Sequence, residues 1–166
     1  MTMTNARKKL IRSLAVCFAA LMAFAAVPAI ANETRDEYKA DVEPICQKNK
    51  QESDKYLKGV RKLVKQDKLK EAGTAFAKAA TALEKAQKQL AQVPQPPADS
   101  AKLNKWLSEI KAEISLMRTI SKKFKAGNKS KATSLAVKLQ NNANKANNLV
   151  IVFSFNYCKI DPSKYT

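Results

Sequence analysis

The sequence predicts an all-α protein: an antiparallel up-down-up-down four-helix bundle closed by one disulfide. Apolar residues recur every three or four positions over four segments, and short turn-forming stretches join these segments, which favours antiparallel neighbours. Cys46 and Cys158 fall at the start of the first segment and the end of the last. These positions share an end only in the antiparallel topology, and a disulfide needs Cα atoms within about 7 Å.

The first predicted helix covers residues 34–65. Thr34 and Glu37 have the spacing of a capping box, and Pro44 either kinks the helix or restarts it. From Cys46 onward, the inward positions are Asn49, Ser53, Leu57, Val60 and Val64. This stripe is weak in its first half, so we expect the helix to be loosely packed and fastened by the disulfide.

The second predicted helix covers residues 68–92, with Asp67 as its expected cap and a proline-rich stretch after it. Its apolar stripe is Leu69, Ala72, Phe76, Ala79, Leu83, Ala86 and Leu90. The third covers residues 100–126, capped by Asp99 or Ser100 and closed by the left-handed residues Gly127 and Asn128. Its stripe is Leu103, Trp106, Leu107, Ile110, Ile114, Met117, Ile120 and Phe124.

The fourth predicted helix covers residues 130–158. Its stripe is Ala132, Ala136, Leu139, Ala143, Ala146, Val150, Phe153 and Tyr157. Residues 150–157 are β-branched and aromatic enough to suit a strand. A lone strand would have no partner in so helical a chain, so we prefer helix.

Residues 1–31 are predicted to be a signal peptide, which leaves residues 32–166 as a single domain. A basic start precedes an apolar run over 14–27 and the small-x-small sequence Ala29-Ile30-Ala31. The protein is therefore expected to be secreted or extracytoplasmic. An uncleaved anchor is the alternative; a lipoprotein is disfavoured because Cys17 lies inside the apolar run.

The mature chain would keep 27 basic and 14 acidic residues, a net charge of +13, because the first 31 residues hold four basic and no acidic side chains. Its two cysteines, Cys46 and Cys158, are expected to pair in an oxidising compartment. Free or redox-active thiols are the alternative, which the absence of a CxxC motif disfavours.

Thirteen basic residues lie in two short stretches that contain a single acidic residue, Asp67. They are Lys55, Lys58, Arg61, Lys62, Lys65, Lys68, Lys70, Arg118, Lys122, Lys123, Lys125, Lys129 and Lys131. The predicted topology brings both stretches to one end, with a charge of +12, opposite an acidic end that starts the first helix. Clustered like charge opposes folding, so it indicates an anionic partner. The alternative is ordinary solvated lysines that complement helix C-termini.

The partners that fit such an end are an envelope polyanion, anionic lipid headgroups or an acidic protein. Specific nucleic-acid binding is disfavoured because no recognition motif is present, the stretches are rich in Lys rather than Arg, and the aromatic residues fall on the core stripes. Insertion into a membrane is disfavoured because the predicted helices have polar outer faces.

An enzyme is not expected, and neither is a cofactor or a metal. The chain has no His and only three Gly, so a Ser or Cys nucleophile would lack its usual base and no phosphate-cradling loop is present. Glu109 and Glu113 form the one carboxylate pair worth weighing, and a lysine partner for Glu113 is the plainer interpretation. Glu84 is expected to pair with Lys88.

The last helix carries five asparagines, Asn141, Asn142, Asn144, Asn147 and Asn148. Because Asn is a poor helix former, they suggest either a solvated face or a polar ridge that contacts a partner. The alternative function is therefore a structural or adaptor protein that meets a protein partner along a helical face. We expect Asn142 to reach the interior.

The segments Glu43-Pro44-Ile45-Cys46 and Asn156-Tyr157-Cys158 carry a resemblance to a known group. With them, the chain resembles small exported, Lys- and Ala-rich helical proteins of unknown function in actinobacteria-like genomes. The resemblance covers most of the mature chain. It implies export, the cysteine pair and a helical bundle, and it brings no activity, ligand or site residue.

Overall fold

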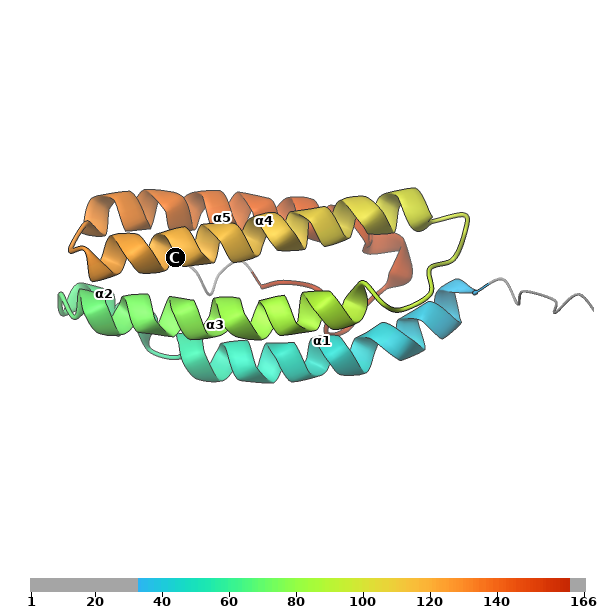
Figure 1. Ribbon diagram of the computed structural model, residues 1–166, viewed down its shortest axis with the longest axis horizontal. Coiled ribbons are helices and arrows are strands. Elements are labelled where there is room, and N and C mark those ends of the chain that lie inside the picture. The colour runs from blue at the N-terminus through green and yellow to red at the C-terminus, as the bar shows by residue number, and fades with distance from the viewer. Residues whose placement is uncertain (1–32, 162–166) are drawn as a thin grey trace, which may run out of the picture. The chain divides into compact units, whose positions relative to one another are not determined.

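The computed structural model describes residues 33–161, and they are all-helical, as predicted. Four long helices pack antiparallel (Figure 1), with α3 against both α1 and α4, and α5 against α4. The elements are α1 (Arg35–Leu57), α2 (Val60–Lys65), α3 (Leu69–Leu90), α4 (Ser100–Lys125), α5 (Lys129–Leu149) and the short 3-10 helix η1 (Ile151–Phe153). The predicted signal peptide lies outside the described residues. No helix in the described range is long and apolar enough to cross a membrane.

The predicted capping box starts α1. The hydroxyl of Thr34 accepts a hydrogen bond from the Glu37 backbone N–H (3.2 Å), and Glu37 Oε2 accepts one from the Thr34 backbone N–H (2.9 Å). Pro44 lies inside α1, which continues through it as one helix. Tyr38 and Val42, one and two turns into α1, are fully buried. Both residues were missed by the predicted stripe, which began only at Cys46.

The prediction of one first helix over 34–65 was wrong. The helix α1 ends at Leu57, and Gly59 adopts a left-handed φ of 78° that residues with a Cβ rarely adopt. The chain changes direction there and begins the short helix α2. This break lets Val60 enter the core, with Leu63 and Val64 packed against it.

The stripes predicted for residues 68–92 and 100–126 form the core between α3 and α4. Phe76 and Phe124 pack with ring centroids 5.8 Å apart. Near them the two helices approach closely at Gly73, where an added Cβ would lie 2.8 Å from the Ser121 carbonyl oxygen and 2.8 Å from Lys125 Cγ. Glycine is therefore the residue that permits this helix spacing.

The prediction that the last helix reaches residue 158 was wrong, because α5 ends at Leu149. The chain makes one 3-10 turn, reverses at Ser154 (φ 48°) and runs back along the bundle (Figure 1). We call residues 154–161 the C-terminal tail. The buried rings of Phe153 and Phe155 explain the change, since Tyr38 and Trp106 offer them a pocket that a straight helix would miss.

The C-terminal tail fills the seam between α1 and α5, which make little direct contact with each other. The Asn147 side chain accepts from the backbone N–H of Ile160 and donates to its carbonyl oxygen, both at 2.8 Å. Cys158 forms the predicted disulfide with Cys46, with an S–S distance of 2.05 Å and Cα atoms 4.9 Å apart. The disulfide therefore closes the bundle through the tail rather than through a fourth helix.

Candidate functional site at the basic end

The turns before α3 and before α5 have the same hydrogen-bonding pattern, offset by 60 residues. Lys68 N–H donates to the Leu63 carbonyl and Asn128 N–H donates to the Lys123 carbonyl, both at 2.9 Å. The residue before each donor is left-handed, with φ of 55° at Asp67 and 76° at Gly127. The bundle is thus built from two similar helical hairpins, and each one delivers lysines to its turn.

A salt bridge joins these two turns directly. Lys129 Nζ, at the start of α5, lies 2.6 Å from Asp67 Oδ1. Asp67 was expected to cap the second helix, and this was wrong: Lys68 is the N-cap residue, and no side chain caps that end. The Asp67 carboxylate instead holds the two basic turns side by side, at the end of the bundle where α2 lies (Figure 1).

Twelve of the thirteen predicted basic residues lie in α2, in the C-terminal turns of α1 and α4, in the N-terminal turns of α3 and α5, or in the connections on either side of α2. We call this set the basic end. Ten of the twelve are exposed, whereas Lys123 and Lys129 are half-buried. The set comprises Lys55, Lys58, Arg61, Lys62, Lys65, Lys68, Lys70, Lys122, Lys123, Lys125, Lys129 and Lys131.

Arg118 is the exception. It lies two turns before the end of α4, and its guanidinium contacts Glu84 Oε2 on α3 at 2.6 Å. Lys88, the predicted partner of Glu84, is farther away, with its Nζ 4.0 Å from Glu84 Oε1. The carboxylate therefore pairs chiefly across the helix interface, and Arg118 faces the groove between α3 and α4.

Helix ends contribute partial charges of both signs to the electric field at this end of the bundle. The C-termini of α1, α2 and α4 present free carbonyls, which lysines such as Lys55, Lys65 and Lys125 complement. The N-termini of α3 and α5 add partial positive charge. Glu71, in the first turn of α3, is the second carboxylate near the turns after Asp67. The cations of the basic end thus outnumber the neighbouring carboxylates several-fold.

A hollow lies between the two turns, where a partner would meet cations and apolar surface together. Its lining comprises the cations Lys68, Lys70 and Lys125, the carboxylates Asp67 and Glu71, and the apolar residues Leu69 and Phe124, with Gly127. Phe124 is buried in the core, so the hollow has a rigid floor. Its rim carries the long flexible side chains, which suits charge-based recognition of an anion better than a fixed fit to one small molecule.

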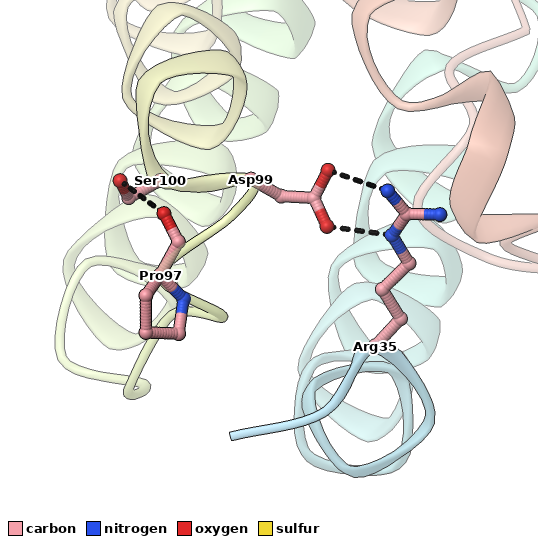
Figure 2. Close-up of polar contacts among 4 residues, drawn as sticks. All are labelled: Arg35, Pro97, Asp99 and Ser100. Carbon is pink, nitrogen blue, oxygen red and sulfur yellow. Dashed lines mark hydrogen bonds and ion pairs between the residues drawn. The ribbon is translucent and has the colours of Figure 1, made fainter. Parts of the chain in front are cut away.

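The carboxylates of the opposite end hold the fold together. Asp99 is 3% exposed and accepts two hydrogen bonds from Arg35, at 2.6 and 2.9 Å (Figure 2). The Arg35 hydrogen bonds lower the pKa of Asp99 against the opposing effect of burial. Asp99 is the N-cap residue of α4, but its side chain makes no capping bond because it binds Arg35. Glu43 accepts from the backbone N–H groups of Asn156 and Tyr157.

The carboxylate pair considered for catalysis is divided between two sites. Glu109 accepts a hydrogen bond from the Asn142 side-chain amide on α5. Glu113 is 1% exposed and lines a cavity of about 70 Å³ between α1, α3, α4 and the C-terminal tail. Lys50 of α1 lines the same cavity. Within residues 33–161, no cluster of three or more His, Cys, Asp or Glu is placed to hold a metal ion.

The five asparagines of α5 do not form one ridge. Asn142 is buried, as expected, and Asn147 holds the C-terminal tail. Asn141, Asn144 and Asn148 remain exposed, at spacings of three and four residues. Two of the five therefore have structural roles that poor helix propensity alone would not reveal.

Sequence reasoning missed two cations that the fold places beside the site. Lys88 and Lys111 lie outside the two basic stretches, yet with Arg118 and Lys122 they line a groove between α3 and α4. Helical periodicity could have identified Lys111, because positions 111, 115, 118 and 122 fall on one face of a helix. Only the pairing of α3 with α4 shows that Lys88 joins them.

A scan against protein-family models and searches of curated proteins and of solved structures found no match to this chain.

Proposed function

We propose that this chain is a non-catalytic protein, exported to the cell envelope or beyond, that binds an anionic partner through the basic end. The observation that supports this most is the contact between the two basic turns. The Lys129–Asp67 salt bridge shows that two cationic segments, 60 residues apart in sequence, lie on one surface. Twelve cations gathered there repel one another, and an anionic partner would relieve that repulsion.

An extracytoplasmic location is supported by two independent features. The Cys46–Cys158 disulfide is of the kind that persists in oxidising compartments. The N-terminal sequence has the basic, apolar and small-residue regions of a signal peptide. An envelope location would place the basic end among anionic polymers and lipid headgroups, which are abundant there.

Binding of the mature chain to anionic material should be strongly salt-dependent. We expect its affinity for inorganic polyphosphate to fall steeply between low and physiological salt, because cation–anion contacts release counterions. A variant with Lys62, Lys65, Lys122, Lys123 and Lys125 changed to Gln should bind more than about 1,000-fold more weakly, given about 1 kcal/mol per cation. Fluorescence anisotropy over a salt series measures both effects.

A matched control separates position from total charge. The variant with Lys48, Lys102, Lys105, Lys138 and Lys145 changed to Gln removes five exposed cations that lie outside the basic end. It should retain most of the affinity. An equal loss of affinity in the two variants would show that only net charge matters. Full binding by the basic-end variant would exclude the basic end as the site.

The alternative is an adaptor protein that meets a protein partner along α5. Its support is the exposed set Asn141, Asn144 and Asn148, with Val137 48% exposed on the same helix. Changing the three asparagines to Ala should then abolish capture of that partner and leave polyphosphate binding unchanged. The basic-end variant should give the opposite result.

A further inference from the structure

A basic groove runs along the side of the bundle from the basic end. It lies between α3 and α4, which are antiparallel neighbours in Figure 1. Its cations are Lys88 on α3 and Lys111, Arg118 and Lys122 on α4. Lys122 belongs to both the groove and the basic end, so the two surfaces are continuous.

The groove has a clear excess of positive charge. Glu84 is the one carboxylate among its lining residues, and it is neutralised by Arg118 at 2.6 Å and, more weakly, by Lys88 at 4.0 Å. The Lys88 side chain is 71% exposed and that of Arg118 is 49% exposed. Both therefore remain open to a ligand on the solvent side, and Lys111 is exposed as well.

The groove is elongated along the axis of α4. Lys111 and Lys122 are eleven residues apart on α4, which is about 16 Å at 1.5 Å per residue. It is concave, with a volume of about 420 Å³. A line of cations in a trough of this length matches several successive anionic groups on one chain, whereas a single small anion would use only part of it.

The groove lies along the helix axes, while the turns of the basic end cap those axes. A flat membrane can press against the end of the bundle or against its side, but it cannot engage both together. A flexible chain can do so by turning at Lys122. Continuous positive charge around this corner therefore favours a strand-like partner over a planar one.

We propose that the anionic partner is a linear polyanion, a chain with closely repeated phosphate or other anionic groups, which runs from the basic end into the α3–α4 groove. This inference rests on the proposed function, because the basic end supplies the first contacts. It adds the shape of the partner and assigns binding roles to Lys88 and Lys111.

The test compares chain length and ligand shape on the mature protein, residues 32–166. The ligands are long-chain inorganic polyphosphate, tripolyphosphate, and vesicles of phosphatidylglycerol with phosphatidylcholine. The double variant Lys88→Gln/Lys111→Gln should weaken binding of the long chain about 30-fold and reduce its salt slope. Its binding of tripolyphosphate and vesicles should match the unmodified protein. The matched control is Lys85→Gln/Lys105→Gln, which removes one exposed cation from each of the same helices outside the groove.

The outcomes separate the two proposals. If the groove variant binds the long chain normally while the five-lysine variant of the basic end fails, the basic end is the site and the groove inference is wrong. Tighter binding of the protein to vesicles than to long-chain polyphosphate would also overturn the inference, in favour of a lipid surface. If the five-lysine variant binds all three ligands normally, the proposed function itself fails. Circular dichroism shows that each variant is folded before its affinities are compared.

Discussion

Single residues in this protein often have roles that their type alone would not suggest. The sequence position of Asp67 predicts a helix cap, but its side chain links two turns. The position of Asp99 also predicts a cap, but its side chain binds Arg35. The sequence spacing predicts Lys88 as the partner of Glu84, but Glu84 pairs mainly with Arg118. Arg118, from another element, is closer to Glu84 (2.6 Å) than Lys88 is (4.0 Å). The two aspartates make charge-assisted bonds to a basic side chain from another element in place of a cap.

Tyr38 gives the clearest prediction at the residue scale. Its ring is fully buried, its hydroxyl has no hydrogen-bond partner within the described residues, and burial raises its pKa to about 12. A tyrosine in the unfolded chain ionises near pH 10. The contribution of neutral Tyr38 to stability is therefore complete below pH 10 and is lost as the pH rises toward 12, because only the unfolded state ionises in that range.

The change Tyr38→Phe should remove this alkaline loss. At neutral pH the variant should be within about 1 kcal/mol of wild type, since the hydroxyl it loses is unsatisfied. Between pH 10 and 12 its free energy of unfolding should gain about 2 kcal/mol relative to wild type. Urea unfolding at several pH values measures this difference, with Tyr157→Phe, at an exposed ring, as the control. A constant difference across this range would contradict the assignment.

At the scale of elements, the spacing of helices depends on small residues as much as on apolar stripes. The stripes of α3 and α4 identify which faces meet, and Gly73 sets how closely they approach. The loosely packed half of α1 was predicted from Asn49 and Ser53. In the structure, those two residues line the cavity beside Glu113. A polar stripe thus leaves an incompletely filled interface.

Replacing Gly73 with Ala tests the close approach of α3 and α4. Alanine favours a helix by about 1 kcal/mol over glycine, but its Cβ would lie 2.8 Å from a backbone oxygen of α4. Because the backbone of α4 cannot move aside easily, the cost of overpacking should exceed the gain in helix propensity. The unfolding free energy should therefore fall by a net of about 1–2 kcal/mol. The neighbouring change Thr74→Ala, at an exposed position, should stay within about 0.5 kcal/mol of wild type. A stabilised Gly73→Ala variant would show that the helices can separate freely.

At the scale of the whole molecule, the described domain separates structural and cationic functions between its two ends. One end holds the Arg35–Asp99 pair, whereas the Glu43 contacts to the tail and the disulfide lie farther along α1, with Cys46 at its midpoint. The other end gathers twelve cations and two turns of the same geometry. Lysines at that end can be changed with little loss of core packing, because most of them are exposed.

Removal of the disulfide should be the largest single loss of stability. The bond closes a loop with a sequence separation of 112 residues, which on the chain-entropy model is worth about 4–5 kcal/mol. We expect the double change Cys46→Ala/Cys158→Ala to lose about that amount in urea unfolding. Amide exchange should also accelerate in the C-terminal tail before it does so in α3 and α4. A loss below about 1 kcal/mol, with the tail still protected, would show that the aromatic contacts alone hold the seam.

The helical class, the second and third stripes, the capping box and the cysteine pairing could all be predicted from the sequence. The helical class, the stripes and the capping box follow from local sequence patterns. The cysteine pairing follows from the antiparallel topology, which short connections between helices favour. The sequence also located most of the basic end, because turns between antiparallel helices must share an end. It could not predict the break at Gly59, since a glycine is tolerated within a helix and only the packing of Val60 requires the change of direction.

Long-range packing determines how the last helix ends and which residues lie beside the basic end. The segment 150–157 has helical spacing, yet burial of Phe153 and Phe155 against Tyr38 and Trp106 contributes more than two further helical turns would. Lys88 and Lys111 became neighbours because α3 and α4 pack together. Local patterns identify which residues are buried or charged, whereas long-range packing determines which of them meet.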